Sequence, residues 1–335
     1  IFVSKGLDKV EVPKAGAGDI VRLTGIDNAN IGETITSTDN PEALPTIKIE
    51  EPTLQISIGP NTSPFAGREG KYSTFRQLEA RLKKELETNV SLRVEKDDTT
   101  FTVSGRGELH LSILIETLRR EGFEMELGRP TVKTKIVDGV EMEPIEELIV
   151  DVPDKYSGAV SSELGHRRAT LLNTVATTDN MTRLTFRLST RALIGLRNAL
   201  LTRTKGTTIM NSLLVGYEPL GAPLQKSRNG ALIASKTGIA VAHGLRVVEE
   251  RGTPFIGPGT KVYEGMIVGL NRRTDDIEIN ACKEKQLTNI RAAAGDMATH
   301  LVPPVILSLE EAMDFIEKDE LLEVTPESLR MRKRY

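Results

Sequence analysis

Residues 101–127 read FTVSGRGELHLSILIETLRREGFEMEL, and this stretch decides the fold. It opens as a short β-type run, breaks at two glycines and continues as a helix from about Glu108. Apolar residues recur there at intervals of three and four, which places one face of the helix against a core: Leu111, Leu114, Ile115 and Leu118. Gly122 is placed to end the helix, and residues 124–127 return to a strand.

The residues before this stretch complete a compact unit. A strand is expected at 53–58 and an amphipathic helix at 72–88, and further strands are expected at 90–94 and 100–103. Together with the helix and strand above, the order is β-α-β-β-α-β. This order is typical of the split βαβ, or ferredoxin-like, sandwich.

The same order then repeats further along the chain. The predicted elements are a strand at 147–152, a helix at 157–168, paired strands at 171–177 and 182–188, a helix that stops at Gly206, and a strand at 208–215. The sequence therefore predicts two successive ferredoxin-like units, each able to bury a modest core between its sheet and its helices.

The regions before and after these two units differ from them in sequence pattern. Residues 1–50 hold short β-type runs, among them 33–36, that suggest the end of a small β-barrel. So few strands cannot close a barrel, and we expect the rest of it upstream. After Pro219 short β runs surround one predicted helix at 308–317, and 280–301 is a long stretch of the kind that is usually functional or disordered.

We therefore expect an α+β protein with several domains. The predicted parts are a β-barrel remainder at 1–50, ferredoxin-like units at 51–143 and 144–217, and a mostly β C-terminal domain with one helix at 218–335.

Composition excludes several classes of function. The 335 residues contain 4% aromatic residues and no Trp, which argues against a stacking platform for single-stranded nucleic acid. A single cysteine, Cys282, excludes an internal disulfide or a thiolate zinc cluster and fits a reducing compartment, the cytoplasm. No apolar run reaches the length of a membrane span, and the four histidines are too far apart in the sequence for a helix-borne metal pair.

Charge is unevenly distributed along the chain although the net charge is only −3. Residues 156–215 hold eight basic residues and two acidic ones, whereas 301–327 holds eight acidic residues and one lysine. A polyanion is therefore expected to meet the middle third of the chain. The candidate RNA-binding residues are Lys155, His166, Arg167, Arg168, Arg191, Arg197, Arg203, Lys205, Asn280, Lys283, Lys285 and Arg291.

Several short motifs resemble translational GTPases of the elongation factor G type. The phrase SGRGELHL at 104–111, with RREGF at 119–123, resembles the third domain of that superfamily. VPDKYSG at 152–158 and GHRR at 165–168 resemble its fifth domain, and the fourth domain, which elongation factor G inserts between them, is absent.

The C-terminal motifs narrow the resemblance to the BipA (TypA) family. They are GLRN at 195–198, TKG at 204–206 and the closing stretch 324–334. The resemblance implies a ribosome-bound GTPase that contacts ribosomal RNA and tRNA and acts in stress response, virulence regulation and assembly of the large subunit. GTP and Mg²⁺ are expected in a G domain upstream, which would be a further partner.

This chain itself is predicted to bind rather than to catalyse. It contains neither the GxxxxGK[ST] phosphate loop nor the NKxD guanine-reading motif, so we expect no cofactor in it. His110 could be a general base, but no nucleophile or acid partner is placed beside it by motif, and we expect it to organise a loop. Gly105 and Gly107 could cradle a phosphate or simply form a tight turn, which we prefer.

Other interpretations stay open at this point. The chain could resemble LepA, whose C-terminal domain also follows the fifth domain, or it could be a metabolic enzyme with a ferredoxin-like site. A third possibility is a protein-only scaffold that uses the acidic stretch 301–327. The cations of 330–334 are either an RNA contact or the solvated face of a strand, and the GHRR arginines could serve only to satisfy a helix dipole.

Overall fold

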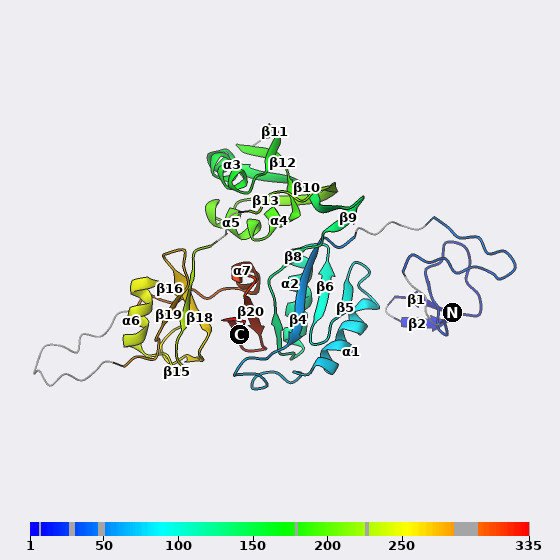
Figure 1. Ribbon diagram of the computed structural model, residues 1–335. Coiled ribbons are helices and arrows are strands. Elements are labelled where there is room, and N and C mark those ends of the chain that lie inside the picture. Colours follow the sequence, from blue (N-terminus) through cyan, green and yellow to red (C-terminus); the bar gives the residue numbers. More distant parts are fainter. Residues whose placement is uncertain are drawn as a thin grey trace, which may run out of the picture. The chain divides into compact units, whose positions relative to one another are not determined.

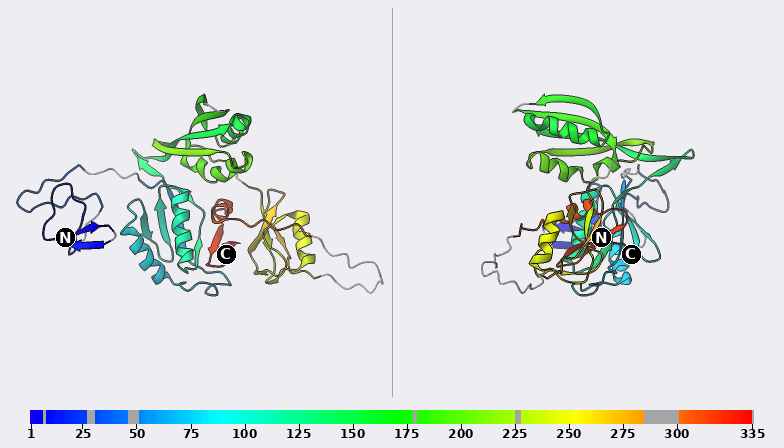
Figure 2. Two further views of the ribbon diagram at one scale, coloured as in Figure 1. Left: turned by 180° about the vertical axis from the view of Figure 1, so that it is seen from behind. Right: turned by 60° about the vertical axis from the view of Figure 1, so that its left-hand side comes forward.

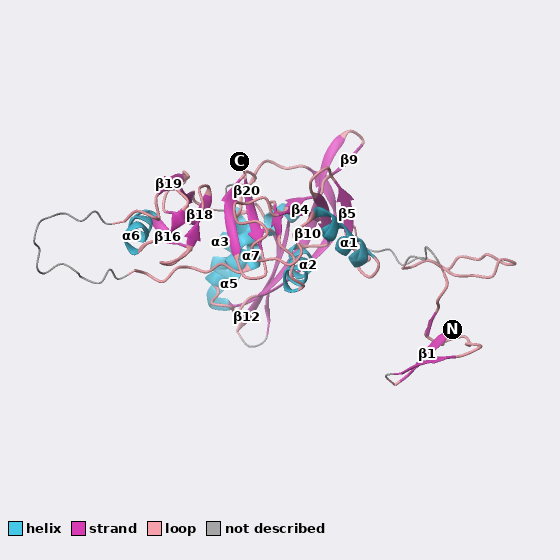
Figure 3. Ribbon diagram, turned by 90° about the horizontal axis from the view of Figure 1, so that it is seen from below, coloured by secondary structure: helices cyan, strands magenta, loops and turns pink. Residues whose placement is uncertain are grey.

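The computed structural model describes residues 1–6, 8–26, 31–45, 51–177, 180–224, 228–284 and 301–334 (Figure 1). The chain divides into two compact units, Ile1–Ile49 and Glu50–Tyr335. Strands outnumber helices, which are short (Figure 3). No helix in the described ranges is both long and apolar enough to cross a membrane.

The smaller unit holds an open antiparallel sheet of three short strands. In the order in which they pair, these are β2 (Asp8–Glu11), β1 (Phe2–Lys5) and β3 (Val21–Arg22). The strand that the sequence predicts at 33–36 is not formed, because these residues lie in an exposed, irregular segment. The described residues of this unit thus form an open sheet and no closed barrel.

The first ferredoxin-like subdomain has the predicted order of elements. They are β4 (Leu54–Pro60), α1 (Phe75–Leu86), β5 (Arg93–Lys96), β6 (Phe101–Gly105), α2 (Glu108–Arg120) and β7 (Met125–Leu127). The strands pair in the order β7-β4-β6-β5, which confirms the split βαβ topology. A capping box between Thr74 and Gln77 starts α1, and the predicted apolar face of α2 is buried.

The second ferredoxin-like subdomain repeats the topology. Its elements are β10 (Val140–Pro153), the 3₁₀ turn η1 (Asp154–Tyr156), α3 (Ser157–His166), β11 (Thr170–Thr177), β12 (Met181–Ser189), α4 (Thr190–Leu193), α5 (Leu196–Arg203) and β13 (Ile209–Pro219). The strands pair in the order β11-β12-β10-β13, and β9 (Lys135–Val137) extends the sheet beside β10. The second helix is interrupted at Gly195, whose φ of 68° lies in the left-handed region.

The C-terminal residues contain more structure than the sequence predicts. The elements are β14 (Ala231–Ala234), β15 (Gly238–Ile239), α6 (Ala242–Arg251), β16 (Gly252–Pro254), β17 (Lys261–Val262), β18 (Met266–Asn271), β19 (Ile277–Ile279), α7 (Leu309–Phe315), β20 (Glu320–Val324) and β21 (Leu329–Lys333). Helix α7 is the one predicted, whereas α6 and β20 are additional. A glycine inside α6, Gly244, hides it from sequence reasoning, since glycine is a poor helix former.

One sheet joins the C-terminal strands to the first ferredoxin-like subdomain. Strand β20 pairs with β7 on one side and with β21 on the other, and β21 continues to β18 and β14. Figure 2 shows α7 and β20, in red, beside the cyan strands of that subdomain. Leu309, Met313 and Leu322 are buried in the same core as Leu111 and Ile115 of α2. Residues far apart in the sequence therefore share one core.

Buried ion pairs hold the C-terminal hairpin in this sheet. Glu323 is fully buried, and it accepts hydrogen bonds from Nε and an amino group of Arg330, each at 3.0 Å. Arg330 also donates to Glu69 at 2.7 Å. Burial alone would raise the pKa of Glu323, but the hydrogen bonds from Arg330 and Ser63 hold it below its usual range.

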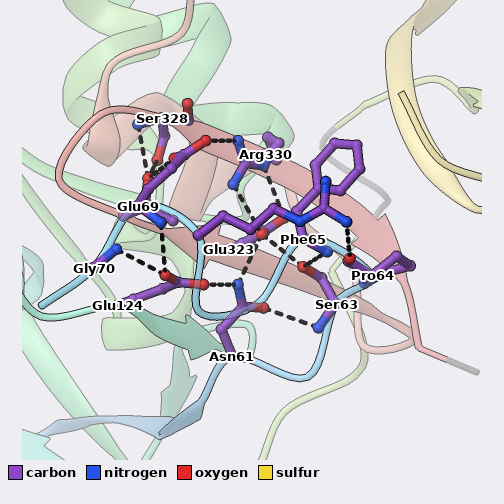
Figure 4. Close-up of polar contacts among 12 residues, drawn as sticks. Asn61, Ser63, Pro64, Phe65, Glu69, Gly70, Glu124, Glu323, Ser328 and Arg330 are labelled. Atoms are coloured by element: carbon purple, nitrogen blue, oxygen red, sulfur yellow. Dashed lines mark hydrogen bonds and ion pairs between the residues drawn. The ribbon is translucent and has the colours of Figure 1, made fainter. Parts of the chain in front are cut away.

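The loop after β4 is held by Glu323 and by a second carboxylate, that of Glu124 (Figure 4). The amide of Asn61 donates to Glu323 and to Glu124, each at 2.7 Å, and Ser63 Oγ donates to Glu323 at 2.6 Å. Glu124 also accepts the backbone N–H of Gly70 at 2.9 Å. A Cβ at Gly70 would lie 2.3 Å from the Cβ of Glu124, so only glycine fits this approach.

The remaining cations of β21 are also neutralised inside the fold. Arg332 pairs with Glu126 at 2.8 Å, and Lys333 lies 2.9 Å from both Asp319 and Glu320. Arg228 is a second partner of Glu320. Three of the eight carboxylates of 301–327, those of Asp319, Glu320 and Glu323, are therefore partners of the basic end of the chain. Of the cations of 330–334, which the sequence left as an RNA contact or a solvated face, Arg330, Arg332 and Lys333 are buried and fit neither alternative, whereas Arg334 is exposed.

Replacing Glu323 with alanine is expected to lower the free energy of unfolding by about 3–5 kcal/mol, because it leaves Arg330 buried without its main partner. Urea unfolding followed by circular dichroism measures this loss. The matched control is Glu327→Ala, in which an exposed carboxylate of the same segment is removed. That change is expected to stay within about 0.5 kcal/mol; equal losses in the two variants would contradict this account of the hairpin.

Candidate nucleic-acid interface

The predicted RNA surface is built on α3 and α5, which cover one face of the second ferredoxin-like sheet. Alternate residues of β10 and β12 face these helices, and Val160 and Leu164 of α3 meet Leu196 and Leu200 of α5 in the same core. The polar sides of both helices are thereby turned outward.

Most arginines of this region are paired with acids. Five of the eight basic residues between 156 and 215 make ion pairs: Arg167 and Arg203 with Glu163, Arg183 with Asp151, Arg187 with Glu218, and Arg191 with Glu143. The local excess of positive charge is therefore less available to a polyanion than the sequence count suggests.

Arg167 is an internal clamp. Its Nε donates to Glu163 at 2.9 Å, and one amino group donates to the carbonyl oxygens of Ala192 and Ile194 at 2.9 and 2.7 Å. Its side chain is 17% exposed. These contacts fix the end of α3 to the backbone just before α5, so the structure gives Arg167 a structural role, although the sequence singles it out for RNA.

The neighbouring Arg168 is different. Its side chain is exposed and makes no hydrogen bond or ion pair in the described part of the chain. Its φ of 60° is left-handed, and the N–H of Ala169 reaches back to the carbonyl of Leu164 at 3.0 Å. This is a Schellman ending, a position that usually holds glycine.

Lys205 repeats this arrangement after α5. Its φ is 53°, and the N–H of Gly206 donates to the carbonyl of Leu201 at 2.8 Å. Both helices thus end with an exposed cation in a conformation that costs a side-chain-bearing residue about 1 kcal/mol or more. Strained residues of this kind often mark functional positions.

Five candidates of this subdomain stay exposed and outside any ion pair within the described residues: Lys155, His166, Arg168, Arg197 and Lys205. The ammonium group of Lys155 lies 4.9 Å from the centre of the Tyr156 ring. Arg191 and Arg203, although also predicted, are paired with Glu143 and Glu163, and Arg203 keeps 48% of its side chain exposed.

The second candidate region is the stretch 280–301. Asn280 is half-buried, and its side-chain oxygen accepts the backbone N–H of Cys282 at 3.0 Å, so it shapes a turn. Lys283 is exposed. Lys285 and Arg291 lie outside the described residues.

His110 organises the turn before α2. Its Nδ1 accepts the N–H of Arg106 at 3.3 Å, and its Nε2 lies 3.1 Å from the side-chain oxygen of Asn89. Burial, and then the charge of Arg106, lower the pKa of His110, which favours the neutral ring. A Cβ at Gly105 would lie 3.0 Å from that Nδ1, which supports the tight-turn reading of this glycine.

Sequence reasoning missed a group of carboxyl and amide side chains between the subdomains. Glu108, Asn198 and Asp314 come from α2, α5 and α7, and no linear motif joins positions so far apart. Asp314 and Asn198 line a cavity of about 860 Å³. In the described part of the chain, no group of three His, Cys, Asp or Glu residues could hold a metal ion.

Two family models match consecutive parts of the chain. Residues 140–228 match "Elongation factor G C-terminus" and residues 229–335 match "TypA/BipA C-terminal domain". The second ferredoxin-like subdomain thus matches a domain of the elongation factor G class.

Curated relatives identify the family more closely. The chain is 48% identical over 98% of its length to "Large ribosomal subunit assembly factor BipA" of Synechocystis, 44% over 100% to that of Bacillus subtilis, and 45% over 98% to that of Escherichia coli K12. It belongs to the BipA family. The chain spans 55% of the length of each of these relatives.

Replacing Arg167 with alanine is expected to lower the free energy of unfolding by about 2 kcal/mol, because charge-assisted hydrogen bonds are lost around a half-buried site. Replacing Arg168 with glycine is expected to raise it by up to about 1 kcal/mol, because glycine relieves the left-handed strain. Urea unfolding measures the change in the free energy of unfolding of each variant. Changes of the same sign in the two variants would contradict the different roles given to Arg167 and Arg168.

Proposed function

We propose that this chain is the ribosome-binding part of a large-subunit assembly factor and that it holds ribosomal RNA by its phosphate backbone. These relatives are named as large ribosomal subunit assembly factors, which supports the ribosome as partner. The observation that carries the RNA contact is the set of exposed cations without an acidic partner on α3, α5 and their ends.

The proposed surface consists of Lys155, His166, Arg168, Arg197 and Lys205, with Arg203 at its edge. Rigid helices present these groups, so they would read the spacing of phosphates in folded RNA rather than base identity. Low aromatic content agrees with this mode, because stacking on bases needs ring faces. Asn280, Lys283, Lys285 and Arg291 are proposed as a second contact, to ribosomal RNA or tRNA.

The chain acts in this proposal by binding and not by catalysis. GTP and Mg²⁺ would be bound by a G domain of the whole protein, whose nucleotide state would control when the RNA surface is used. Stress response, virulence regulation and a cytoplasmic location belong to the same proposal, since the family resemblance implies them.

The acidic scaffold is a weaker candidate. Its surface would need the carboxylates of 301–327, but Glu320 and Glu323 are buried and Glu317 is paired with Arg129. Glu311, Asp319 and Glu327 stay exposed, so the acidic surface left for a partner protein is smaller than the sequence count suggests.

The double change Arg168→Glu with Arg197→Glu is expected to weaken binding to purified large ribosomal subunits by at least tenfold, because two phosphate contacts become repulsive. The slope of log Kd against log salt is expected to flatten by about 2, since each lost phosphate contact contributes about 1. Cosedimentation at several salt concentrations measures both quantities.

The matched control is Lys236→Glu with Lys261→Glu, which makes the same charge change at exposed positions beside β15 and β17. It is expected to leave the affinity within threefold of the unchanged chain. If both double variants weakened binding equally, the effect would come from net charge and not from the assigned surface. If Arg168→Glu with Arg197→Glu did not weaken binding, the assigned surface would be refuted.

A further inference from the structure

The three parts of the larger unit meet at a half-buried pair of carboxyl groups. Glu108 begins α2 of the first ferredoxin-like subdomain, Asp314 lies on α7 of the C-terminal part, and Gly195 precedes α5 of the second subdomain. Asp314, Gly195 and Asn198 share the wall of the 860 Å³ cavity between these parts.

The contacts at this cluster are close. The amide of Asn198 donates to Oδ2 of Asp314 at 2.8 Å. A Cβ at Gly195 would lie 3.2 Å from Cγ of Asp314, and φ at this glycine is 68°, so both the space and the backbone conformation favour glycine. Helix α2, which begins at Glu108, packs against α7, and Oγ of Ser112 in α2 lies 3.9 Å from the sulfur of Met313 in α7. The start of α5 is therefore held at Asp314, beside the start of α2.

Two oxygen atoms of this cluster have no donor. Oε1 of Glu108 and Oδ1 of Asp314 are buried, and neither has a hydrogen-bond partner in the described part of the chain. Two carboxylates in contact cannot both be ionised at low cost. One proton between them would satisfy the unpartnered oxygens and remove the repulsion.

The surrounding charges do not replace this proton. Glu310 on α7 adds negative charge, and Glu311 lies on the same cavity wall. Four arginines that line the cavity have partners of their own: Arg191 is paired with Glu143, Arg129 with Glu317 and Arg228 with Glu320, and Arg167 holds Glu163 and the backbone before α5. His166 and Lys318 also line the cavity, and both are exposed to water, which screens their charge. Burial, followed by the hydrogen bond and the charge of Asp314, raises the pKa of Glu108 to about 9.

We infer that Glu108 and Asp314 share one proton, and that this protonated pair is a latch which holds the start of α5, and with it the second ferredoxin-like subdomain, against α2 and α7. The inference concerns the joint between subdomains and does not rest on RNA binding. Loss of the proton leaves two half-buried negative charges side by side, and the joint then opens.

The sign of the pH dependence follows from proton uptake. Glu108 is ionised in the unfolded chain above its ordinary pKa of 4.5 and stays protonated in the folded chain up to about 9, so folding takes up one proton between these values. The contribution of this group is complete below pH 4.5 and is lost as the pH rises towards 9. Within this window the folding equilibrium constant falls tenfold per pH unit on account of this group.

The first test measures urea unfolding of the 335-residue chain at pH 6, 7, 8 and 9, together with Glu108→Gln. Glutamine keeps the shape of the side chain and a neutral hydrogen-bond donor, so the variant is expected to fold. Its folding equilibrium constant is expected to lose the tenfold fall per pH unit that the proton on Glu108 causes. The control Glu311→Gln, an exposed carboxylate on the same wall, is expected to keep the original slope. An unchanged slope in Glu108→Gln, or failure of that variant to fold, would overturn the inference.

The second test measures the latch itself. Spin labels are attached at Arg120→Cys in α2 and Thr202→Cys in α5, with Cys282→Ser to remove the native thiol. Electron–electron double resonance is expected to give one narrow distance at pH 7 and a broad distribution at pH 10, whereas Glu108→Gln stays narrow at both. A distribution equally narrow at pH 10 without the Gln substitution would show that the proton does not hold the joint.

Discussion

The pairing of buried Glu320 and Glu323 with cations, two of them on the neighbouring strand, is the constraint on which the rest of the larger unit depends. A carboxylate with no exposed surface is tolerated only when charged donors surround it, and here Arg330, Lys333 and Arg228 supply them. These pairs seat β20 and β21 between β7 and β18, so that one sheet runs from the first ferredoxin-like subdomain into the C-terminal part. They also neutralise charges that would otherwise contribute to an acidic and a basic surface.

Ion pairs also neutralise most arginines of the second ferredoxin-like subdomain. Glu163 holds Arg167 and Arg203, and strand residues hold Arg183 and Arg187, so that pairing stiffens the sandwich and leaves only a few cations at its helix ends. Arg168 and Lys205 are exposed in left-handed conformations that glycine would occupy more cheaply. Strained positions of this kind often belong to functional sites, and here the strained residue carries an exposed positive charge.

The order of elements was predictable from sequence, and the pairing of charges was not. The spacing of apolar residues and the positions of glycines predict both β-α-β-β-α-β units, because local spacing decides which face of a helix or strand is buried. Partners such as Arg330 and Glu69 are 261 positions apart, and Glu108 and Asp314 are joined by no motif. A count of basic residues cannot distinguish Arg167, which is held by Glu163 and two carbonyl oxygens, from Arg168, which has no ion pair among the described residues. Strand β20 was hidden because its buried glutamates read as a solvated acidic run.

Native-state hydrogen exchange of the backbone amides tests the central claim most directly. If buried ion pairs make β20 and β21 part of the first subdomain's core, their amides exchange with the same opening free energy as those of β4 and β6, which corresponds to unfolding of the whole core. Exchange of β20 and β21 through a separate opening of markedly lower free energy, while β4 and β6 stay protected, would contradict the account.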